Sequence, residues 1–262
     1  MKAYKAFDEN LRCLGFQFEV GGSFEHDGEV RVCRSGFHAC ENPLDVWNYY
    51  PLDSRYAVVE LGGEILRHGA DSKVAAGRIT IRAEITLPQL INDGVAYLTG
   101  LCKTAASGKC SQLAASGYGS QLAASGDYSK LAASGDGSQL AASGKCSQLA
   151  ASGDGSQLAA SGKRSQLAAS GDYSKLAASG DGSKLAASGY GSQLAAFGND
   201  SVCMAASHGS TARAGAGGAI ALTYHDGVRY RIAVAYVGED GIEPNVNYYV
   251  TADGVFAKAN ER

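Results

Sequence analysis

The sequence predicts a mainly β fold built around a two-sided β-solenoid, and three observations support this. Residues 107–196 are ten consecutive copies of one nine-residue unit, Ser-Gly-x-x-Ser-[Gln/Lys]-Leu-Ala-Ala. The leucine of that unit recurs every nine residues from Leu113 to Leu194. No proline lies between residues 89 and 243, which is typical of a long segment that uses its backbone N–H groups continuously.

Each repeat is expected to form a short strand followed by a corner. A helix would place successive leucines on opposite faces, because nine residues make two and a half turns, and every unit would carry a glycine that costs about 1 kcal/mol. In a strand, Ser111, Leu113 and Ala115 share one face, whereas Gln112 and Ala114 share the other. The Ser-Gly-x-x segment then forms the corner, and we expect its glycine to take a positive φ.

Two units per coil give about 18 residues, and three give about 27. We favour 18 because this register places Gly119, Gly137, Gly155 and Gly191 in one column, with Tyr173 as the exception. It also stacks a ladder of mostly compensating charges, formed by Lys109, Asp127, Lys145, Lys163 and Asp181. The solenoid is expected to span residues 96–222 and to be roughly 30 Å long. In less regular units, the leucine position is taken by Thr104, Cys203, Ala212 and Ala221.

The variable corner positions are the candidate binding residues of the array. Identical units offer identical surroundings, whereas catalysis needs one asymmetric constellation, so the array is better suited to binding than to chemistry. Corners are also exposed and free to vary without any function. The binding hypothesis selects the large side chains that an interface would use, namely Tyr118, Tyr128, Arg164, Tyr173 and Tyr190.

No metal or cofactor is expected in the array. Its nine-residue period is similar to that of calcium-binding β-rolls, but serine stands where that motif has its ligand aspartate. The aspartates of the array lie in the corners, in a different frame. Rows of Thr-x-Thr, which an ice-binding face would need, are also missing from the repeat.

Residues 1–95 differ in composition and predict a separate small α+β domain. Strands are expected at residues 4–7, 16–20, 29–33, 56–61 and 78–85, and a short helix is expected to begin at Pro43 with Asn42 as its cap. The densest cluster of reactive side chains is Cys33, His38 and Cys40. Its spacing matches none of the common zinc patterns, and no orienting third group accompanies a Cys–His pair. We therefore expect no metal there and keep His38 as a candidate binding residue.

Residues 223–262 predict a small β cap on the array. Asp226-Gly227 between two alternating runs indicates a hairpin turn. A solenoid this thin needs its open ends covered, so we expect these strands to close one end. A cap that also forms a homodimer is the alternative.

Composition narrows the classes of partner. The net charge of −3 gives no basic excess for nucleic-acid binding, and no run of 18 apolar residues predicts a membrane span. The first residues show no apolar run typical of a signal peptide. Seven cysteines, an odd number, favour reduced thiols and a location in the bacterial cytoplasm.

Two resemblances add to this prediction. Tyr4-Lys5-Ala6-Phe7 and the stretch Gly36 to Val46, Gly-Phe-His-Ala-Cys-Glu-Asn-Pro-Leu-Asp-Val, resemble the N-terminal domain of an uncharacterised family of phage and prophage proteins. Members of that family often carry Ala-Ala-Ser-Gly repeats, so the resemblance implies a phage or prophage origin.

The order of strand, Gly-Phe-His turn, helix and Val-Val-Glu-Leu-x-Gly strand is also similar to ADP-ribosyltransferase domains. That resemblance implies a dinucleotide-gripping residue at the position of Lys5 and a catalytic glutamate near Glu84. The middle motif differs, since His38-Ala39-Cys40 stands where those enzymes have Ser-Thr-Ser.

Three functions are weighed on this basis. The favoured one is a non-enzymatic binding protein of phage or prophage origin that inhibits or sequesters a host protein, such as a component of a bacterial anti-phage defence. The second is an ADP-ribosyltransferase-like enzyme with the solenoid as its targeting arm. The third is a structural protein of the virion.

Overall fold

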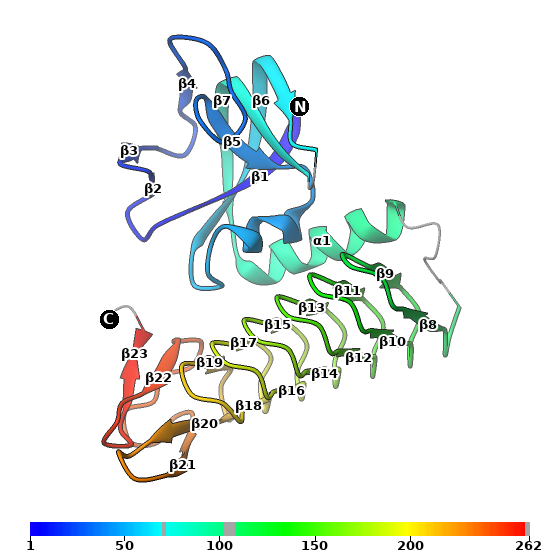
Figure 1. Cartoon of the computed structure of the whole chain (residues 1–262), viewed down its shortest axis with the longest axis vertical. Coiled ribbons are helices and arrows are strands. Elements are labelled where there is room, and N and C mark those ends of the chain that lie inside the picture. The colour runs from blue at the N-terminus through cyan, green and yellow to red at the C-terminus, as the bar shows by residue number, and fades with distance from the viewer. Residues whose placement is uncertain (70–71, 102–107, 260–262) are drawn as a thin grey trace. The chain divides into compact units, whose positions relative to one another are not determined.

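A computed structural model describes residues 1–69, 72–101 and 108–259 of the protein. The chain divides into two compact units, Met1–Tyr97 and Leu98–Arg262 (Figure 1). Each unit has its own hydrophobic core, and each is described by itself below.

The N-terminal unit is a small antiparallel sheet that closes on itself. Strand β1 (Lys2–Phe7) pairs with β5 (Phe37–Cys40) and β6 (Arg55–Arg67), and β7 (Lys73–Ile85) pairs with both β5 and β6. These four strands therefore form a ring, to which β4 (Ser23–Glu25) adds along β7. Strands β2 (Arg12–Cys13) and β3 (Phe16–Gln17) form a separate two-stranded hairpin.

An aromatic cluster fills one side of this sheet. Phe7, Phe18 and Phe37 are buried there, and the ring of Phe18 lies 5.2 Å from that of Phe7 and 6.0 Å from that of Phe37. The rings of Phe16 and Phe24 join from the exposed side. Offset and edge-to-face contacts of this kind add to the stabilisation from apolar burial alone.

Two helical segments begin in the described part of the N-terminal unit, each at a different kind of capping sequence. The expected helix at Pro43 is confirmed as a 3₁₀ helix, η1 (Pro43–Asn48), whose cap Asn42 accepts a hydrogen bond from the Leu44 backbone N–H. Helix α1 (Leu87–Leu101) was not predicted. Its signal is a capping box, in which Thr86 and Gln89 each accept a hydrogen bond from the other's backbone N–H.

One expected strand of this unit is wrong. Residues 29–33 do not form a strand, because the chain turns back there and Cys33 has a φ of 61°. The only pairing is an isolated bridge between Arg31 and Ser35. The strand expected at 16–20 is reduced to Phe16–Gln17, whereas the strands expected at 4–7, 56–61 and 78–85 are confirmed and are longer in the structure.

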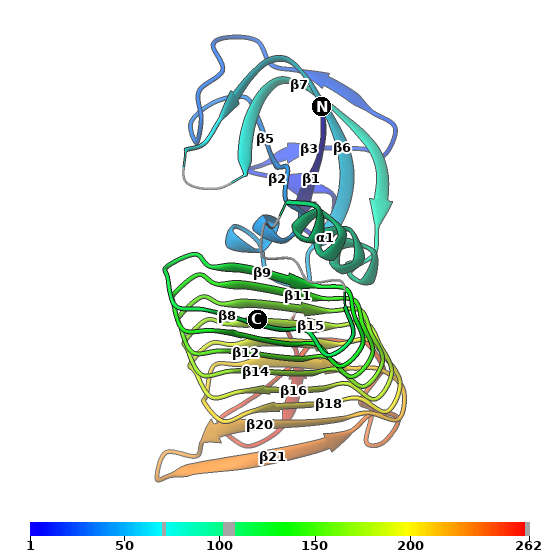
Figure 2. The ribbon, with the colours of Figure 1, turned by 90° about the vertical axis from the view of Figure 1, so that its right-hand side faces the viewer.

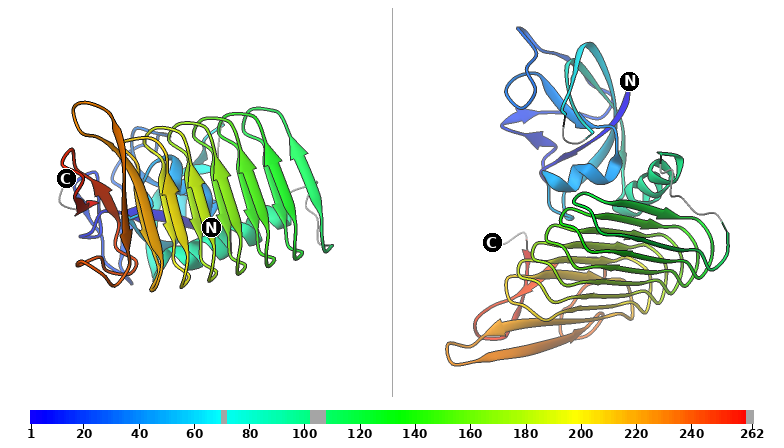
Figure 3. Two further views of the ribbon diagram at one scale, coloured as in Figure 1. Left: turned by 90° about the horizontal axis from the view of Figure 1, so that it is seen from below. Right: turned by 45° about the vertical axis from the view of Figure 1, so that its right-hand side comes forward.

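The predicted two-sided solenoid with about 18 residues per coil is confirmed. Leu131 pairs in parallel with Leu113 and Leu149, 18 residues before and after it. The strands alternate between two eight-stranded sheets, stacked as Figures 2 and 3 show. The β8 sheet contains β8 (Gln112–Ala115), β10 (Lys130–Ala133), β12 (Gln148–Ala151), β14 (Gln166–Ala169), β16 (Lys184–Ala187), β18 (Val202–Ala205), β20 (Ala219–His225) and β21 (Tyr230–Tyr236). The β9 sheet contains β9 (Gln121–Ala124), β11 (Gln139–Ala142), β13 (Gln157–Ala160), β15 (Lys175–Ala178), β17 (Gln193–Ala196), β19 (Thr211–Ala214), β22 (Tyr248–Val250) and β23 (Phe256–Lys258).

The repeat's invariant glycine has a different role from the one expected. Its φ is not positive; the left-handed conformation falls two residues later, for example at Gly155, with a φ of 63°. The invariant glycine is required because adjacent coils touch there. A Cβ on Gly153 would lie 2.3 Å from the carbonyl oxygen of Gly135, and the equivalent glycines from Gly126 to Gly198 show the same approach.

The leucine and serine of each unit fill the interior. Leu140, Leu158 and the other repeat leucines from Leu122 to Leu194 are buried in one continuous core with the second alanine of each unit, and Leu113 of the first unit is half-buried. The hydroxyl of Ser156 donates to the Gly153 carbonyl at 2.7 Å, and this bond recurs from coil to coil. It closes the corner and satisfies a buried polar pair.

The end of the array departs from the expected register. Cys203 and Ala212 occupy the leucine position as predicted, but Ile220, rather than Ala221, pairs with Cys203. The corner before β20 is one residue shorter, since Gly215 stacks on Gly198 and the residue before the glycine is lost. Thr104 lies outside the described residues.

The C-terminal strands cover this end of the core, as expected. β20 and β21 form the predicted hairpin, in which the Asp226 backbone N–H donates to the Arg229 carbonyl. Ile220, Leu222, Val237 and Tyr248 continue the core beyond Leu194, the last leucine of the repeats.

Candidate binding surface

The five corner residues selected from the sequence lie on two edges of the solenoid. The first edge is formed by the corners that lead into the β9 sheet, and it carries Tyr118, Tyr173 and Tyr190. The second edge is formed by the corners that lead into the β8 sheet, and it carries Tyr128 and Arg164. The solenoid has two sides, so these residues do not form one surface.

The first edge carries a continuous row of aromatic side chains, which we call the aromatic row: Tyr173, Tyr190, His208, Tyr230 and His225. Consecutive rings are 5.6, 5.0, 5.6 and 5.0 Å apart between centroids. All five residues are exposed. The two histidines and Tyr230 were not among the sequence candidates. His208 occupies the same corner position as Tyr190, so the 18-residue register contains the signal for it.

Three aspartates lie in the same column of the first edge, ahead of the aromatic row. The carboxylate of Asp154 accepts the backbone N–H of Asp172, and Asp172 accepts that of Tyr190. Asp136 accepts the N–H of Asp154 in the same way. Each carboxylate therefore links two coils and leaves negative charge along this edge. Tyr118 stands alone beyond them, 88% exposed.

The second edge is a charged ladder, as the register predicted. Lys163 and Asp181 form an ion pair of 2.9 Å across adjacent coils, which holds the pKa of Asp181 below its usual value. Asp127 accepts the backbone N–H of Lys145. Tyr128 and Arg164 stand next to this ladder, at corner positions whose φ values are 61° and 58°.

A shallow groove of about 820 Å³ runs along the outer face of the β8 sheet. The first alanine of each unit forms its floor, and the Gln or Lys before it forms one wall. At the C-terminal end the lining changes to Val202 and Met204. The floor of small side chains does not by itself indicate a ligand.

His38 lies half-buried on β5 in the N-terminal unit. Its Nε2 accepts a hydrogen bond from the Cys33 backbone N–H at 3.0 Å, so this nitrogen is not open to a ligand. Burial, with Lys73 and Lys5 nearby, lowers the pKa of His38. Among the described residues, no group of three or more His, Cys, Asp or Glu side chains is arranged to hold a metal ion.

Lys5 is the most unusual side chain of this unit, because it is a lysine that is only 4% exposed. Its Nζ donates to the His38 carbonyl at 2.9 Å and to the Cys13 Sγ at 3.3 Å. Burial lowers the pKa of Lys5, against an opposing effect of the Cys13 thiol. Cys13 also lies 2.9 Å from the Tyr50 hydroxyl, and burial raises the pKa of Tyr50.

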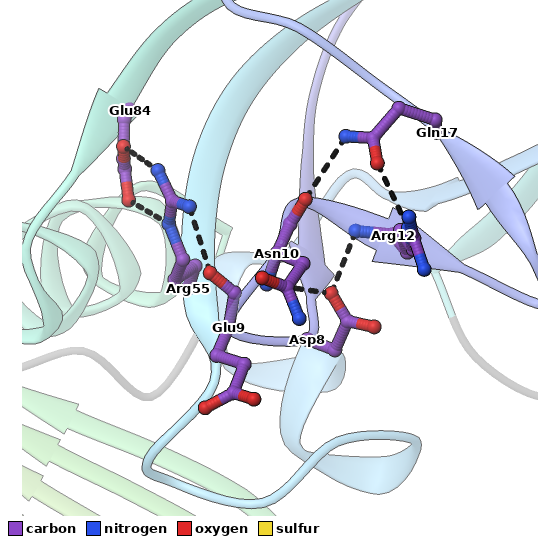
Figure 4. Close-up of polar contacts among 7 residues, drawn as sticks. All are labelled: Asp8, Glu9, Asn10, Arg12, Gln17, Arg55 and Glu84. Atoms are coloured by element: carbon purple, nitrogen blue, oxygen red, sulfur yellow. Dashed lines mark hydrogen bonds and ion pairs between the residues drawn. The ribbon is translucent and has the colours of Figure 1, made fainter.

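A polar network fastens the turn after β1, as Figure 4 shows. Asp8 accepts the backbone N–H groups of Asn10 and Arg12, and Gln17 bridges Asn10 and Arg12. These hydrogen bonds shape the turn that carries Cys13 toward Lys5.

Beside this turn, Arg55 grips both carboxylate oxygens of Glu84 at 2.7 Å and donates to the Glu9 carbonyl (Figure 4). The pKa of Glu84 is lowered by this pairing. Both groups therefore have a structural role that ties β6 to β7 and to the turn.

Comparison with known families finds a match for the N-terminal unit. Residues 1–93 match the family described as a domain of unknown function, DUF7666. The chain carries an N-terminal DUF7666 domain. A β-solenoid of repeats follows it. No curated protein and no solved structure matches the chain.

The described helices of the DUF7666 domain and of the solenoid unit include none with the length and apolar character that a membrane span needs. The longest of them is α1, with 15 residues.

Proposed function

We propose that this protein is a non-enzymatic binding protein and that the aromatic row docks a partner protein. The aromatic row itself is the observation that supports this. Five exposed rings in contact along one rigid edge form a large apolar and hydrogen-bonding surface. Tyrosine supplies such contact area at low cost in side-chain entropy, and it is enriched at energetically important interface positions.

The backbone of the corners gives a second argument. Tyr173 occupies a left-handed position that is glycine in the other coils of its column, for example Gly155 and Gly191. Tyr128 and Arg164 occupy the left-handed position of the second edge, where the other coils carry Cys110, Cys146, Gly182 and Asp200. A non-glycine residue costs about 1–2 kcal/mol in this conformation. Large side chains held there despite that cost favour a role in recognition.

The charge of the first edge narrows the chemistry of the partner. Asp136, Asp154 and Asp172 place three carboxylates in line with the aromatic row. A partner surface that combines basic groups with apolar ones fits this edge. Nucleic acid does not, because its phosphates would face these carboxylates.

The finer hypothesis names the partner as a host protein, such as a component of a bacterial anti-phage defence. It rests on the resemblance of the Gly36–Val46 stretch to phage and prophage proteins. The transferase alternative has less support from the geometry of the DUF7666 domain. Lys5 is buried, and Glu84 is held by Arg55, so neither group is free to meet a dinucleotide. Incubation with labelled nicotinamide dinucleotide and lysate tests this alternative, and transfer or hydrolysis would favour it.

The binding proposal is tested by affinity capture from lysates of several bacterial hosts with the full-length protein. A Tyr173→Ser/Tyr190→Ser variant interrupts the aromatic row, and Tyr118→Ser is the matched control on the same edge. We expect one partner to be recovered at near-equal amounts by the wild type and the control and to be lost with the double variant. A partner captured equally by all three, or none in any host, would count against the proposal.

A further inference from the structure

Strand β21 forms one edge of the β8 sheet, and β8 forms the other. The order of this sheet ends β18–β20–β21, and within the described residues β21 pairs only with β20 (Figure 2). A free edge strand presents unpaired N–H and C=O groups, and natural proteins commonly protect such edges with lysine, proline or a bulge. Tyr230–Tyr236 contains neither lysine nor proline, and its pairing with β20 runs without a register shift. Its one charged residue, Arg231, is held in an ion pair with Asp226 of the same hairpin.

The backbone groups on the outer side of β21 can be assigned from the pairing with β20. The Val237 N–H donates to the Gly218 carbonyl, and the Asp226 N–H donates to the Arg229 carbonyl. Hydrogen-bonded pairs alternate along an antiparallel ladder, so the odd-numbered residues of β21 bond to β20. The N–H and C=O groups of Tyr230, Ile232 and Val234 therefore point outward. In the described part of the chain, they have no hydrogen-bond partner.

The same residues carry exposed apolar side chains. Ile232 is 69% exposed and Val234 is 54% exposed, with Tyr230 and Tyr236 exposed on either side of them. Met204 extends this apolar face onto β18. Elsewhere the outer face of the β8 sheet carries glutamine, lysine and alanine, so the apolar character is confined to its C-terminal end.

We infer that β21 pairs with β21 of a second copy of this chain, antiparallel and about a two-fold axis at Ala233. The strand reads Tyr-Arg-Ile-Ala-Val-Ala-Tyr, and its outward residues are nearly palindromic about Ala233. In this register Ile232 faces Val234 of the second copy, and Tyr230 faces Tyr236 of the second copy. A two-fold interface requires this kind of self-complementary pattern. The β8 sheets of the two copies then form one continuous sheet.

Charge complementarity favours the antiparallel pairing. Arg229 is exposed at the start of β21, and Glu239 and Asp240 are exposed just after its end. None of the three forms an ion pair within the described residues. The proposed register brings the start of β21, with Arg229, next to the end of β21 of the second copy, where the turn after Tyr236 carries Glu239 and Asp240. The two-fold axis repeats this contact, whereas parallel pairing would bring like charges together.

The dimer is separable from the proposed binding function. Only Tyr230 belongs to both surfaces, so the test variants leave it unchanged. An Ile232→Lys/Val234→Lys variant places two charges on the outward face of β21 and keeps its bonds to β20. Val228→Lys is the control, because Val228 is 86% exposed but lies in the turn, outside the paired segment.

Sedimentation analysis of the full-length protein over a range of concentrations tests the inference. We expect the wild type and Val228→Lys to show twice the monomer mass, and the double-lysine variant to show the monomer mass throughout. Far-UV circular dichroism of all three proteins checks that the fold is kept. A monomeric wild type, or a dimer that survives both lysines, would overturn the inference. A wild-type monomer that still captures a partner through Tyr190 would leave the binding proposal standing.

The register has its own test. Residues at the two-fold axis form a pair without hydrogen bonds, in which Cα atoms are about 4.5 Å apart and within disulfide range. Ala233→Cys is therefore expected to form a disulfide with its own copy under mild oxidation, identified by peptide mapping. Arg229→Cys, farther from the axis, is the control and is expected to form none. Cross-linking at residue 229 and not at 233 would rule out this register.

Discussion

The α-carbon of Gly153 lies so close to the carbonyl oxygen of Gly135 that a Cβ there would stand 2.3 Å from that oxygen. The two glycines are 18 residues apart, one above the other in adjacent coils. Gly155, two residues later, has open space around its Cβ position but a φ of 63°. One corner therefore contains two glycines with different physical requirements.

This difference predicts unequal effects of the same substitution. Gly153→Ala forces the coils apart against backbone atoms, and we expect it to cost more than about 3 kcal/mol. Gly155→Ala meets only the left-handed strain of about 1–2 kcal/mol, which the chain already accepts at Tyr173. Denaturant midpoints followed by far-UV circular dichroism compare the two variants. Equal midpoints would show that the coils do not touch at Gly153.

The two serines of a repeat are predicted to differ in the same way. Ser156 is fully buried and donates to the Gly153 carbonyl at 2.7 Å, whereas Ser152 is exposed. Ser156→Ala leaves that carbonyl without its side-chain donor, at a cost of about 1–3 kcal/mol. Ser152→Ala is expected to change the free energy of unfolding by no more than about 0.5 kcal/mol. A small effect at both positions would mean that water replaces the serine hydroxyl.

The regular part of the fold follows from the sequence because each unit repeats the same local choices. The leucine period and the 18-residue column of Gly119 and Gly137 define strand, face and coil. The role of Gly153 could not be predicted from the sequence. A glycine is needed there because the neighbouring coil comes close, and not because of the φ of Gly153 itself. The one-residue deletion before β20 is not visible in the sequence either. A count of nine residues from Ala212 leads to Ala221, whereas Ile220 occupies that position in the structure.

The candidate surface is less predictable than the fold. Tyr173 and Tyr190 stand out in the repeat, but their contact with Tyr230 depends on the hairpin that follows the array. Lys5 gives no sequence signal of burial, because its partners lie outside its own strand: Cys13 follows in the next hairpin, and the His38 carbonyl belongs to β5. Both features arise from tertiary contacts between different elements of the fold.

The buried lysine makes a prediction about pH. The pKa of Lys5 is lowered in the folded protein, so holding the proton there costs stability at neutral pH. This cost falls as pH rises from the folded pKa toward the unfolded value near 10.4. The free energy of unfolding of the wild type, relative to Lys5→Met, is therefore expected to rise with pH, by at most about 1.4 kcal/mol per pH unit.

Guanidinium unfolding at several pH values measures this difference. Lys2→Met is the control, because Lys2 lies on the same strand and is exposed. Its difference from the wild type is expected to stay nearly constant over the same range. If the Lys5→Met difference is also constant, Lys5 is not a buried lysine that exchanges a proton on unfolding.

The cysteines of the solenoid make the last prediction. Cys203 takes the leucine position, fully buried, and burial raises the pKa of its thiol to about 12, while the thiol donates to the Arg213 carbonyl. Cys110 is an exposed corner residue. Alkylation requires the thiolate and access to it, so native Cys203 is expected to react at least about a thousand times more slowly than Cys110. Peptide mapping after timed alkylation measures both rates, and denaturant should make them equal. Comparable rates in the native protein would show that the capped end of the core opens readily.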